Sequence, residues 1–106
     1  MPKYLLRASY TAEGTKGLLK DGGTKRQAAA RTLIESLGGK MEALYWAFGQ
    51  DDIFGIVDLP DHASAAAASM ALGGSGAIKG NITVLLTAED IDKAATKSAA
   101  YTPPGR

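Results

Sequence analysis

The stretch from Leu44 to Asp61 constrains the fold most, because it holds two apolar runs of β-type separated by a turn and followed by a helix start. Aromatic and β-branched residues favour extended chain on both sides of residues 49–52, whose Gly, Gln and Asp side chains tolerate a turn. Pro60 ends the second run, and Asp61 is of the residue type that caps a helix N-terminus. The segment therefore predicts a β-hairpin that leads directly into a helix.

The size and composition predict one domain over residues 1–99, with residues 100–106 as a flexible tail. Twelve Lys and Arg residues oppose eleven Asp and Glu residues, so no broad positive field would attract nucleic acid or an anionic membrane. The lack of cysteine excludes disulfides, a thiolate nucleophile and sulfur-ligated zinc. No apolar run has the length of a signal peptide or a membrane span, so we expect a cytoplasmic protein.

Hydrophobic periodicity divides the chain into alternating strands and helices. Strands are predicted at residues 3–10, 40–48, 52–59 and 78–87. Helices are predicted from Thr11 to about residue 20, from a capping box at Thr24 to residue 37, from 62 to 72 after the Asp61 cap, and from 88 to 99 after the Thr87 cap. This order is that of an α+β, ferredoxin-like βαββαβ sandwich, in which both core helices cover one face of a four-stranded antiparallel sheet.

Alternation along the strands predicts which residues face the helices and which face away. We expect the helix side to hold Tyr4, Leu6, Ala8, Ala43, Tyr45, Ala47, Ile53, Val57, Ile82, Val84 and Leu86. The opposite face would hold Leu5, Leu44, Trp46, Phe48, Phe54, Ile56 and Leu85, beside Lys3, Arg7, Glu42, Asp58, Asn81 and Thr83. An apolar surface of that size is unusual on a monomer, which predicts a homodimer or higher homo-oligomer paired sheet to sheet as an α/β barrel.

The space between two such sheets would hold the ligand-binding candidates, which combine apolar and charged side chains: Arg7, Glu42, Leu44, Trp46, Phe48, Phe54 and Asp58. We expect the first and third strands to be parallel neighbours at the centre of the sheet, with Arg7 and Asp58 on the same face. A charge in an apolar space needs an opposite charge nearby. Arg7 and Asp58 are therefore predicted to pair, with Glu42 as a third member.

Other chemistry-bearing residues have structural interpretations. His62 lies in the first turn of a predicted helix and is read as a surface residue, while Asp51 and Asp52 are read as turn formers. The Gly73–Gly76 run ends a helix, whereas phosphate loops precede one. One histidine and no cysteine make no metal site, and no cofactor is expected.

The sequence resembles the GYD domain family over roughly Pro2 to Glu89. The resemblance is carried by Tyr4-Leu5-Leu6, Tyr10-Thr11-Ala12-Glu13-Gly14, Leu37-Gly38-Gly39-Lys40, the turn before Ile53, and Leu59-Pro60-Asp61 before an Ala-rich helix. The family's Gly, any residue, Tyr, Asp turn is present as Gly49 and Asp52, but Asp51 stands where the Tyr would be. The resemblance implies a ferredoxin-like fold related to dimeric α/β-barrel proteins, which include cofactor-free monooxygenases, lactone isomerases and simple ligand binders.

Two classes of function follow. The favoured one is a small-molecule-binding or regulatory module that holds an apolar or aromatic ligand, with Arg7 for an anionic end. The alternative is a cofactor-independent monooxygenase or isomerase acting on a small aromatic or lactone substrate, with Asp58, Glu42 or His62 moving a proton. A carboxylate or His62 inside an enclosed pocket would favour the enzyme, because binding alone needs neither.

Overall fold

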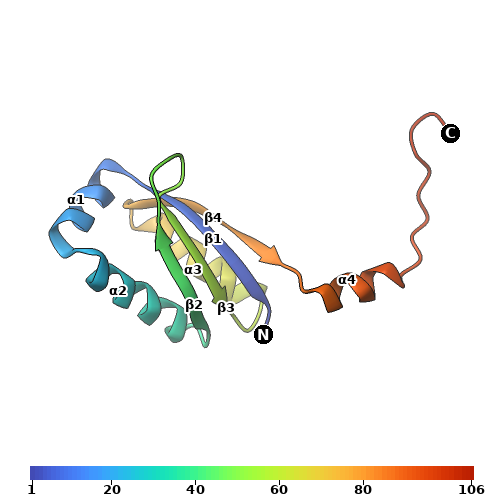
Figure 1. Cartoon of the computed structure of the whole chain (residues 1–106), viewed down its shortest axis with the longest axis horizontal. Coiled ribbons are helices and arrows are strands. Elements are labelled where there is room, and N and C mark those ends of the chain that lie inside the picture. The colour runs from blue at the N-terminus through green and yellow to red at the C-terminus, as the bar shows by residue number, and fades with distance from the viewer.

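A computed structural model describes all 106 residues and has an α+β, ferredoxin-like architecture (Figure 1). Its single sheet is antiparallel, in the order β2-β3-β1-β4. The strands are β1 (Lys3–Tyr10), β2 (Lys40–Trp46), β3 (Ile53–Asp58) and β4 (Ile78–Leu85). The helices are α1 (Ala12–Asp21), α2 (Gly23–Ser36), α3 (His62–Gly74) and α4 (Ala88–Ala95). The predicted fold class is confirmed, whereas the pairing of two sheets stays a prediction.

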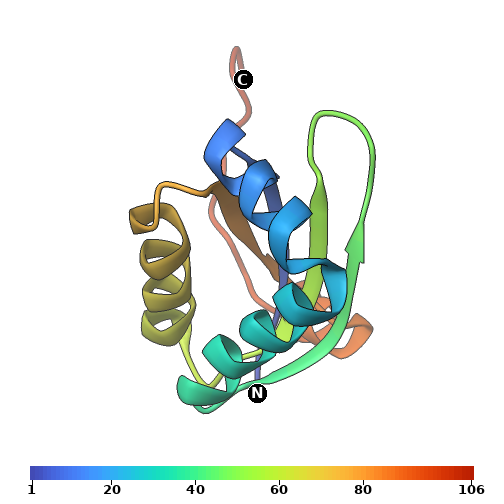
Figure 2. The ribbon, with the colours of Figure 1, turned by 90° about the vertical axis from the view of Figure 1, so that its left-hand side faces the viewer.

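Two helices cover one face of the sheet, which we call the covered face; the other is the open face. Helix α2 packs against β2 and α3 packs against β4, so α3 stands to one side and α2, with α1, to the other (Figure 2). The core is a cluster of 11 buried residues on this side, with Tyr4, Val57 and Leu59 the largest of those fully buried. The alanines Ala65 and Ala68 let α3 approach the sheet closely.

Strands β3 and β1 are the two central strands of the sheet, and β1 runs antiparallel to both of its neighbours. Tyr4 lies opposite Val57 of β3 and Val84 of β4. The prediction that the first and third strands are parallel is therefore wrong. In the antiparallel register the residue opposite Asp58 is Lys3, and Arg7 lies opposite Phe54, four positions further along β1.

Strand β2 departs from simple alternation. Its register against β3 shifts between Met41 and Ala43, so Met41 and Leu44 are both buried although they are three positions apart. Beyond the irregularity, each residue of β2 faces the side of the sheet opposite to the one that simple alternation predicts. Leu44 and Trp46 belong to the covered face and Tyr45 to the open face, contrary to the predicted assignment.

Three of the four helices begin at a side-chain cap, as predicted. The Thr11 hydroxyl accepts a hydrogen bond from the Gly14 amide at 3.1 Å, and the Asp61 carboxylate accepts one from the Ser64 amide at 2.8 Å. Helix α4 has a full capping box between Thr87 and Asp90. These caps satisfy amides that the first helical turn leaves without a partner.

Helix α2 begins differently, and the capping box predicted at Thr24 is wrong. Gly22 alone separates α1 from α2, and its φ of +81° is a left-handed conformation that glycine adopts easily. The chain therefore re-enters a helix at Gly23, which places Thr24 inside α2, where no side-chain cap is made.

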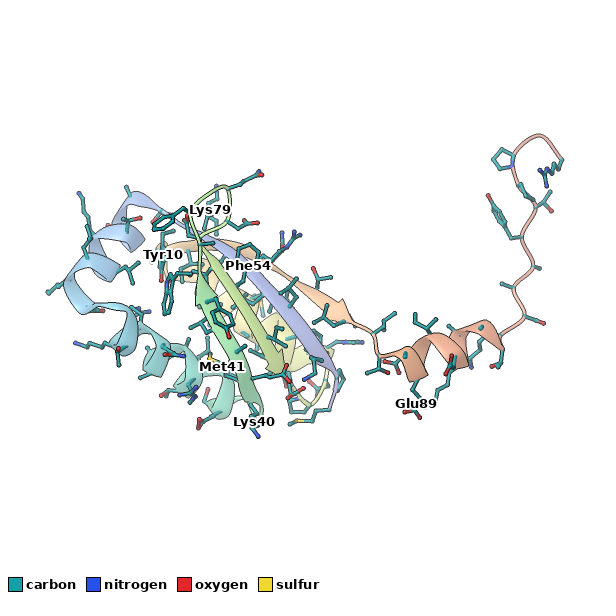
Figure 3. The ribbon with its side chains drawn as sticks, in the orientation of Figure 1. Tyr10, Lys40, Met41, Phe54, Lys79 and Glu89 are labelled. Carbon is teal, nitrogen blue, oxygen red and sulfur yellow. The ribbon has the colours of Figure 1, made fainter.

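Several predicted elements end at different residues in the structure. Strand β2 ends at Trp46 rather than at residue 48, β4 ends at Leu85 rather than at 87, and α4 ends at Ala95 rather than at 99. Helix α4 is exposed along its whole length and extends away from the sheet, as the position of Glu89 shows in Figure 3. None of the four helices combines the length and hydrophobicity that crossing a lipid bilayer requires.

Candidate functional site

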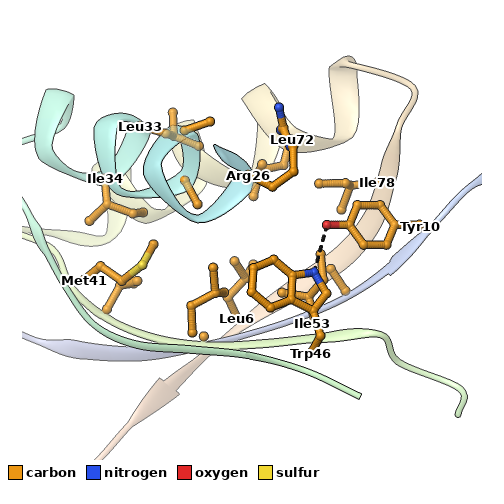
Figure 4. Close-up of a pocket in the computed structure, with 16 residues that line it drawn as sticks. Leu6, Tyr10, Arg26, Leu33, Ile34, Met41, Trp46, Ile53, Leu72 and Ile78 are labelled. Atoms are coloured by element: carbon orange, nitrogen blue, oxygen red, sulfur yellow. Dashed lines mark hydrogen bonds between the residues drawn. The ribbon is translucent and has the colours of Figure 1, made fainter. Parts of the chain in front are cut away.

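The best-formed hollow in the molecule is a cavity of about 140 Å³ between the covered face and the helices (Figure 4). Fourteen of the 16 residues that line it are hydrophobic. Its floor is formed by the sheet, and its roof by α2 with one residue of α3. The residues that line it include Leu6, Tyr10, Arg26, Ala30, Leu33, Leu44, Trp46, Gly55, Leu72 and Ile78.

Small residues explain why a space remains at the centre of this layer. Gly55 lies in the middle of β3 between Leu6 and Leu44, and it projects no side chain into the core. Ala29 and Ala30 form part of the roof, where larger residues would fill the gap. A glycine inside a strand commonly marks a place where another group approaches the backbone. The sequence thus builds a hollow into an otherwise close-packed core.

Three polar groups lie in the walls of this cavity. The Trp46 indole Nε1 donates a hydrogen bond to the Tyr10 hydroxyl at 3.1 Å, which ties the end of β2 to the end of β1. Arg26 of α2 is the third, and its guanidinium lies 3.6 Å from Asp21. Trp46 reaches the cavity only because of the irregularity in β2. These groups give an apolar space a small number of fixed polar contacts, as in most ligand sites.

No carboxylate and no histidine is among the residues that line the cavity. In the enzymatic alternative Asp58, Glu42 or His62 would have to lie within hydrogen-bonding reach of the substrate. The arrangement can therefore bind a small molecule, and it offers none of the bases named in the enzymatic alternative.

The seven predicted ligand-binding residues do not form one site. Leu44 and Trp46 line the cavity on the covered face. Four others lie on the open face or at its edge: Arg7, Glu42, Phe54 and Asp58. Phe48 follows the end of β2 and is fully exposed. The structure thus brings together only two of the seven at the cavity.

The charged residues of the open face pair differently from the prediction. Lys3 lies 2.9 Å from Asp58 and 3.3 Å from Glu42, so the carboxylates find Lys3 as their cation and not Arg7. The hydrogen bond to Asp58 is the main cause that raises the pKa of the Lys3 ammonium above its ordinary value; desolvation opposes the rise, and Glu42 adds to it. Arg7 is exposed and makes no ion pair, because the antiparallel register places Lys3 opposite Asp58.

A second, open hollow of about 450 Å³ lies between α3 and β4. On its wall the hydroxyl of buried Tyr4 shares a hydrogen bond of 2.7 Å with His62 Nδ1, and the two rings meet edge to face at 86°. His62 is exposed, as its surface interpretation predicts. Its contact with Tyr4 spans 58 residues of sequence, and it depends on how α3 sits on the sheet, so no local pattern indicates it.

The paired acids Asp51 and Asp52 hold the hairpin against the end of β1. Asp52 accepts a hydrogen bond from the Tyr10 amide at 3.0 Å, and the Ser9 hydroxyl, which donates to the Gln50 carbonyl at 2.6 Å, lies 3.4 Å from the Asp51 carboxylate. Both contacts are structural, which agrees with the interpretation as turn formers. They also fix the end of β1 that carries Tyr10 into the cavity.

Sequence reasoning missed Tyr10 and Arg26 as site residues. Tyr10 falls in the strand predicted at residues 3–10 and Arg26 in the helix predicted to begin at Thr24, and neither is among the ligand-binding candidates. The available signal was Gly55, which interrupts an apolar strand and so indicates a close approach or a gap.

The model of the GYD domain family matches residues 4–95 of this chain. No match was found among curated proteins or among solved structures.

Proposed function

This chain belongs to the GYD domain family, and we propose that it is a small-molecule-binding or regulatory module whose ligand occupies the cavity on the covered face. The observation that carries the proposal is the cavity itself, which is almost wholly apolar and lacks any carboxylate or histidine. A binding role needs neither group, and Asp58, Glu42 and His62, the residues that would move a proton in the enzymatic alternative, all lie outside this cavity.

The volume sets the size of the ligand. The cavity of about 140 Å³ is close to the roughly 150 Å³ apolar cavity that is known to hold benzene in another protein. A ligand with one six-membered ring, or a short branched chain, therefore fits without large rearrangement. Burying such a body in apolar walls supplies most of the driving force for binding.

The test uses Trp46, the only tryptophan, whose indole lines the cavity. Titration with a ring-sized probe such as toluene should change the tryptophan fluorescence in a saturable way. Ala30→Leu fills the roof and should weaken binding by about tenfold or more, whereas Ala28→Leu, on the exposed side of the same helix, should leave it unchanged. Equal binding by the two variants would contradict the location of the site.

We further propose that the open face mediates a homodimer. Cross-strand rows on this face align Tyr45 with Phe54 and Arg7, and Ala43 with Ile56 and Leu5, so apolar side chains from three strands are contiguous. Such a surface favours a second copy that covers it. Sedimentation should show a dimer that Ile56→Glu dissociates, while Ala28→Glu on the outer side of α2 has no effect. A monomer at micromolar concentration would reject this proposal.

One observation favours the enzymatic alternative, a cofactor-independent monooxygenase or isomerase of small aromatic or lactone substrates. The Tyr4–His62 hydrogen bond places an imidazole beside the hollow between α3 and β4. In this alternative His62 would move the proton. Oxygen uptake with hydroquinone and isomerisation of an unsaturated lactone, measured for the parent and for His62→Gln, test it; turnover that His62→Gln abolishes would support the enzyme.

A further inference from the structure

We infer that residues 86–95 form a docking arm that packs against the second copy of the chain in the homodimer. The arm consists of Leu86, the capping residue Thr87 and helix α4. This inference rests on the pairing of open faces proposed above, and it adds a contact surface outside the sheet. It follows from the position of α4, which no part of its own chain covers.

The arm extends away from the sheet and the other helices (Figure 1). Every residue from 86 to 95 is exposed, and α4 has no buried residue. The radius of gyration of the chain is 16.9 Å, whereas a compact chain of this length would have about 13 Å. The rest of the domain therefore provides no packing surface for the arm.

Helix α4 has the residue pattern of a helix that packs against a surface. Ala88, Ile91 and Ala95 recur at spacings of three and four residues and lie on one side with Ala94, while the charged residues lie on the other. Ile91 is 53% exposed, and Leu86, just before the cap, is 63% exposed. The arm thus carries two large apolar side chains that have no partner in their own chain.

The helix is too short to be stable without a surface that covers it. It has eight residues, and the capping box between Thr87 and Asp90 satisfies amides only in its first turn. Isolated helices shorter than about 12–15 residues are marginal in water, and most helices in proteins are stabilised by packing of their apolar side. The apolar side of α4 therefore needs a surface from outside its own domain.

The end of β4 connects the arm to the open face. Leu85, the last residue of β4, lies opposite Lys3 of β1 and shares the open face with Leu5 and Arg7. The arm begins at the next residue. A second copy that is seated on the open face therefore lies beside the start of the arm, and the two contact surfaces are continuous.

The charge of Arg7 also favours a second copy as the partner. Arg7 makes no ion pair, because Lys3 engages both Asp58 and Glu42. Pairing of the open faces would take the Arg7 guanidinium out of water, and a buried charge needs an opposite charge nearby. Its own chain leaves no carboxylate of the open face available for this role.

The arm carries a carboxylate that can fill this role. Its three acids outnumber its single lysine. Glu89 lies 3.9 Å from Lys93, and Asp90 accepts a hydrogen bond from the Thr87 amide, which leaves Asp92 without a partner in its own chain. The arm of one copy can therefore supply the negative charge that Arg7 of the other copy needs.

Sedimentation over a series of concentrations tests the inference, because it gives the dissociation constant of the dimer for variants of the full chain. Ile91→Ala removes the largest side chain of α4 without lowering helix propensity, and it should raise the dissociation constant at least about tenfold. Thr96→Ala, at the end of the same helix, is the control and should leave it unchanged. Asp92→Asn should raise it about fivefold, whereas Glu89→Gln should not.

The backbone chemical shifts of α4 give a second measurement. In the dimer they should be helical. In Ile56→Glu, the variant expected to be a monomer, they should move toward those of an unfolded segment, while the shifts of the four strands stay as they are. Shifts of α4 that remain helical in the monomer would show that the chain supports the helix by itself, and would overturn the arm.

The outcomes separate the arm from the pairing of open faces. A dimer that Ile56→Glu dissociates and Ile91→Ala leaves unchanged would overturn the arm and leave the open-face pairing standing. A dimer that Ile91→Ala weakens and Ile56→Glu does not would support the arm and reject the open-face pairing. A parent protein that sediments as a monomer at micromolar concentration would reject both.

Discussion

The two faces of the sheet use similar residue types for different purposes. On the covered side, Trp46 and Tyr10 of the sheet and Arg26 of α2 line an apolar cavity between the sheet and the helices, whereas the open face places Tyr45, Phe54 and Arg7 in one cross-strand row at the surface. Each face thus combines two aromatic residues with one arginine. The two faces differ because helices shield only the covered face. A single shift of register between Met41 and Ala43 decides which residues of β2 point toward those helices.

Hydrogen bonds between polar groups are stronger where water is excluded. On the open face Lys3 satisfies Asp58 and Glu42 in a partly solvated cluster, and such pairs contribute little to stability. On the covered face the hydrogen bond from Trp46 to Tyr10 sits at the edge of an apolar space. Electrostatic interactions there are stronger because the surroundings are less polarisable.

The largest expected difference in the free energy of unfolding is between variants of two adjacent residues of β2. Leu44 is buried on the covered face, so Leu44→Ala should lower the free energy of unfolding by about 3 kcal/mol. Tyr45 is 70% exposed on the open face, and Tyr45→Ala should cost less than about 1 kcal/mol. Urea unfolding of the two variants measures both values. A larger loss for Tyr45→Ala would mean that Tyr45 is the buried residue, as simple alternation predicts, and would contradict the irregularity in β2.

Two glycines of α1 test how tightly the layer beside the cavity is packed. A Cβ atom at Gly14 of α1 would collide with the Ala77 carbonyl and lie 2.9 Å from the Tyr10 ring, whereas one at Gly17 would meet nothing within 4 Å. Gly14→Ala should therefore destabilise the protein by about 2 kcal/mol, and Gly17→Ala should stabilise it by up to about 1 kcal/mol. Thermal melts of the two variants decide the signs, and equal shifts would be inconsistent with this packing.

The two helices over the covered face should respond differently to removal of the residues at their starts. Asp61→Ala removes the cap of α3 and should lower the melting temperature by more than Thr24→Ala, which replaces a residue inside α2 by a better helix former. A larger loss for Thr24→Ala would indicate that α2 starts where the sequence pattern predicts.

The Asp61 cap also predicts a dependence on pH. The hydrogen bond from the Ser64 amide lowers the pKa of the Asp61 carboxyl below its ordinary value. A lowered pKa stabilises the folded state fully above the unfolded pKa of about 3.9, and the contribution is lost as the pH falls through the folded value. The advantage of the parent over Asp61→Ala should thus be constant near neutral pH and shrink below about pH 4. Melting temperatures across this range would contradict the cap if the difference stayed constant.

The smallest expected effect concerns the charges of the open face. A double-mutant cycle between Lys3 and Asp58 should give a measurable coupling, because their charged atoms lie 2.9 Å apart. The same cycle between Arg7 and Asp58 should give none, because Arg7 makes no ion pair. A coupling between Arg7 and Asp58 that exceeds the one with Lys3 would mean that the register of β1 against β3 is different.

The order of strands and helices could be predicted because its signals are local. Thr11, Asp61 and Thr87 each mark a helix start through a contact that spans only three residues. The family resemblance rests on similarly short motifs, and it is confirmed by the match over residues 4–95.

The candidate site could not be predicted because it depends on contacts between distant elements. The shift in β2 is visible only against β3, although two large apolar residues at Met41 and Leu44 were an available hint. Arg7 and Asp58 were correctly placed on one face, but the direction of the neighbouring strand decides which cation meets Asp58. The cavity itself requires α2 and α3 to be placed over Gly55.

The most direct test of the central claim is to locate a bound probe by NMR. With toluene present in excess, nuclear Overhauser effects from its ring protons identify the methyl groups within contact distance. The account predicts contacts with Leu33, Leu72 and Ile78, which line the cavity on the covered face. Contacts with Leu5 and Ile56 of the open face instead would contradict it, and would place the ligand between paired sheets.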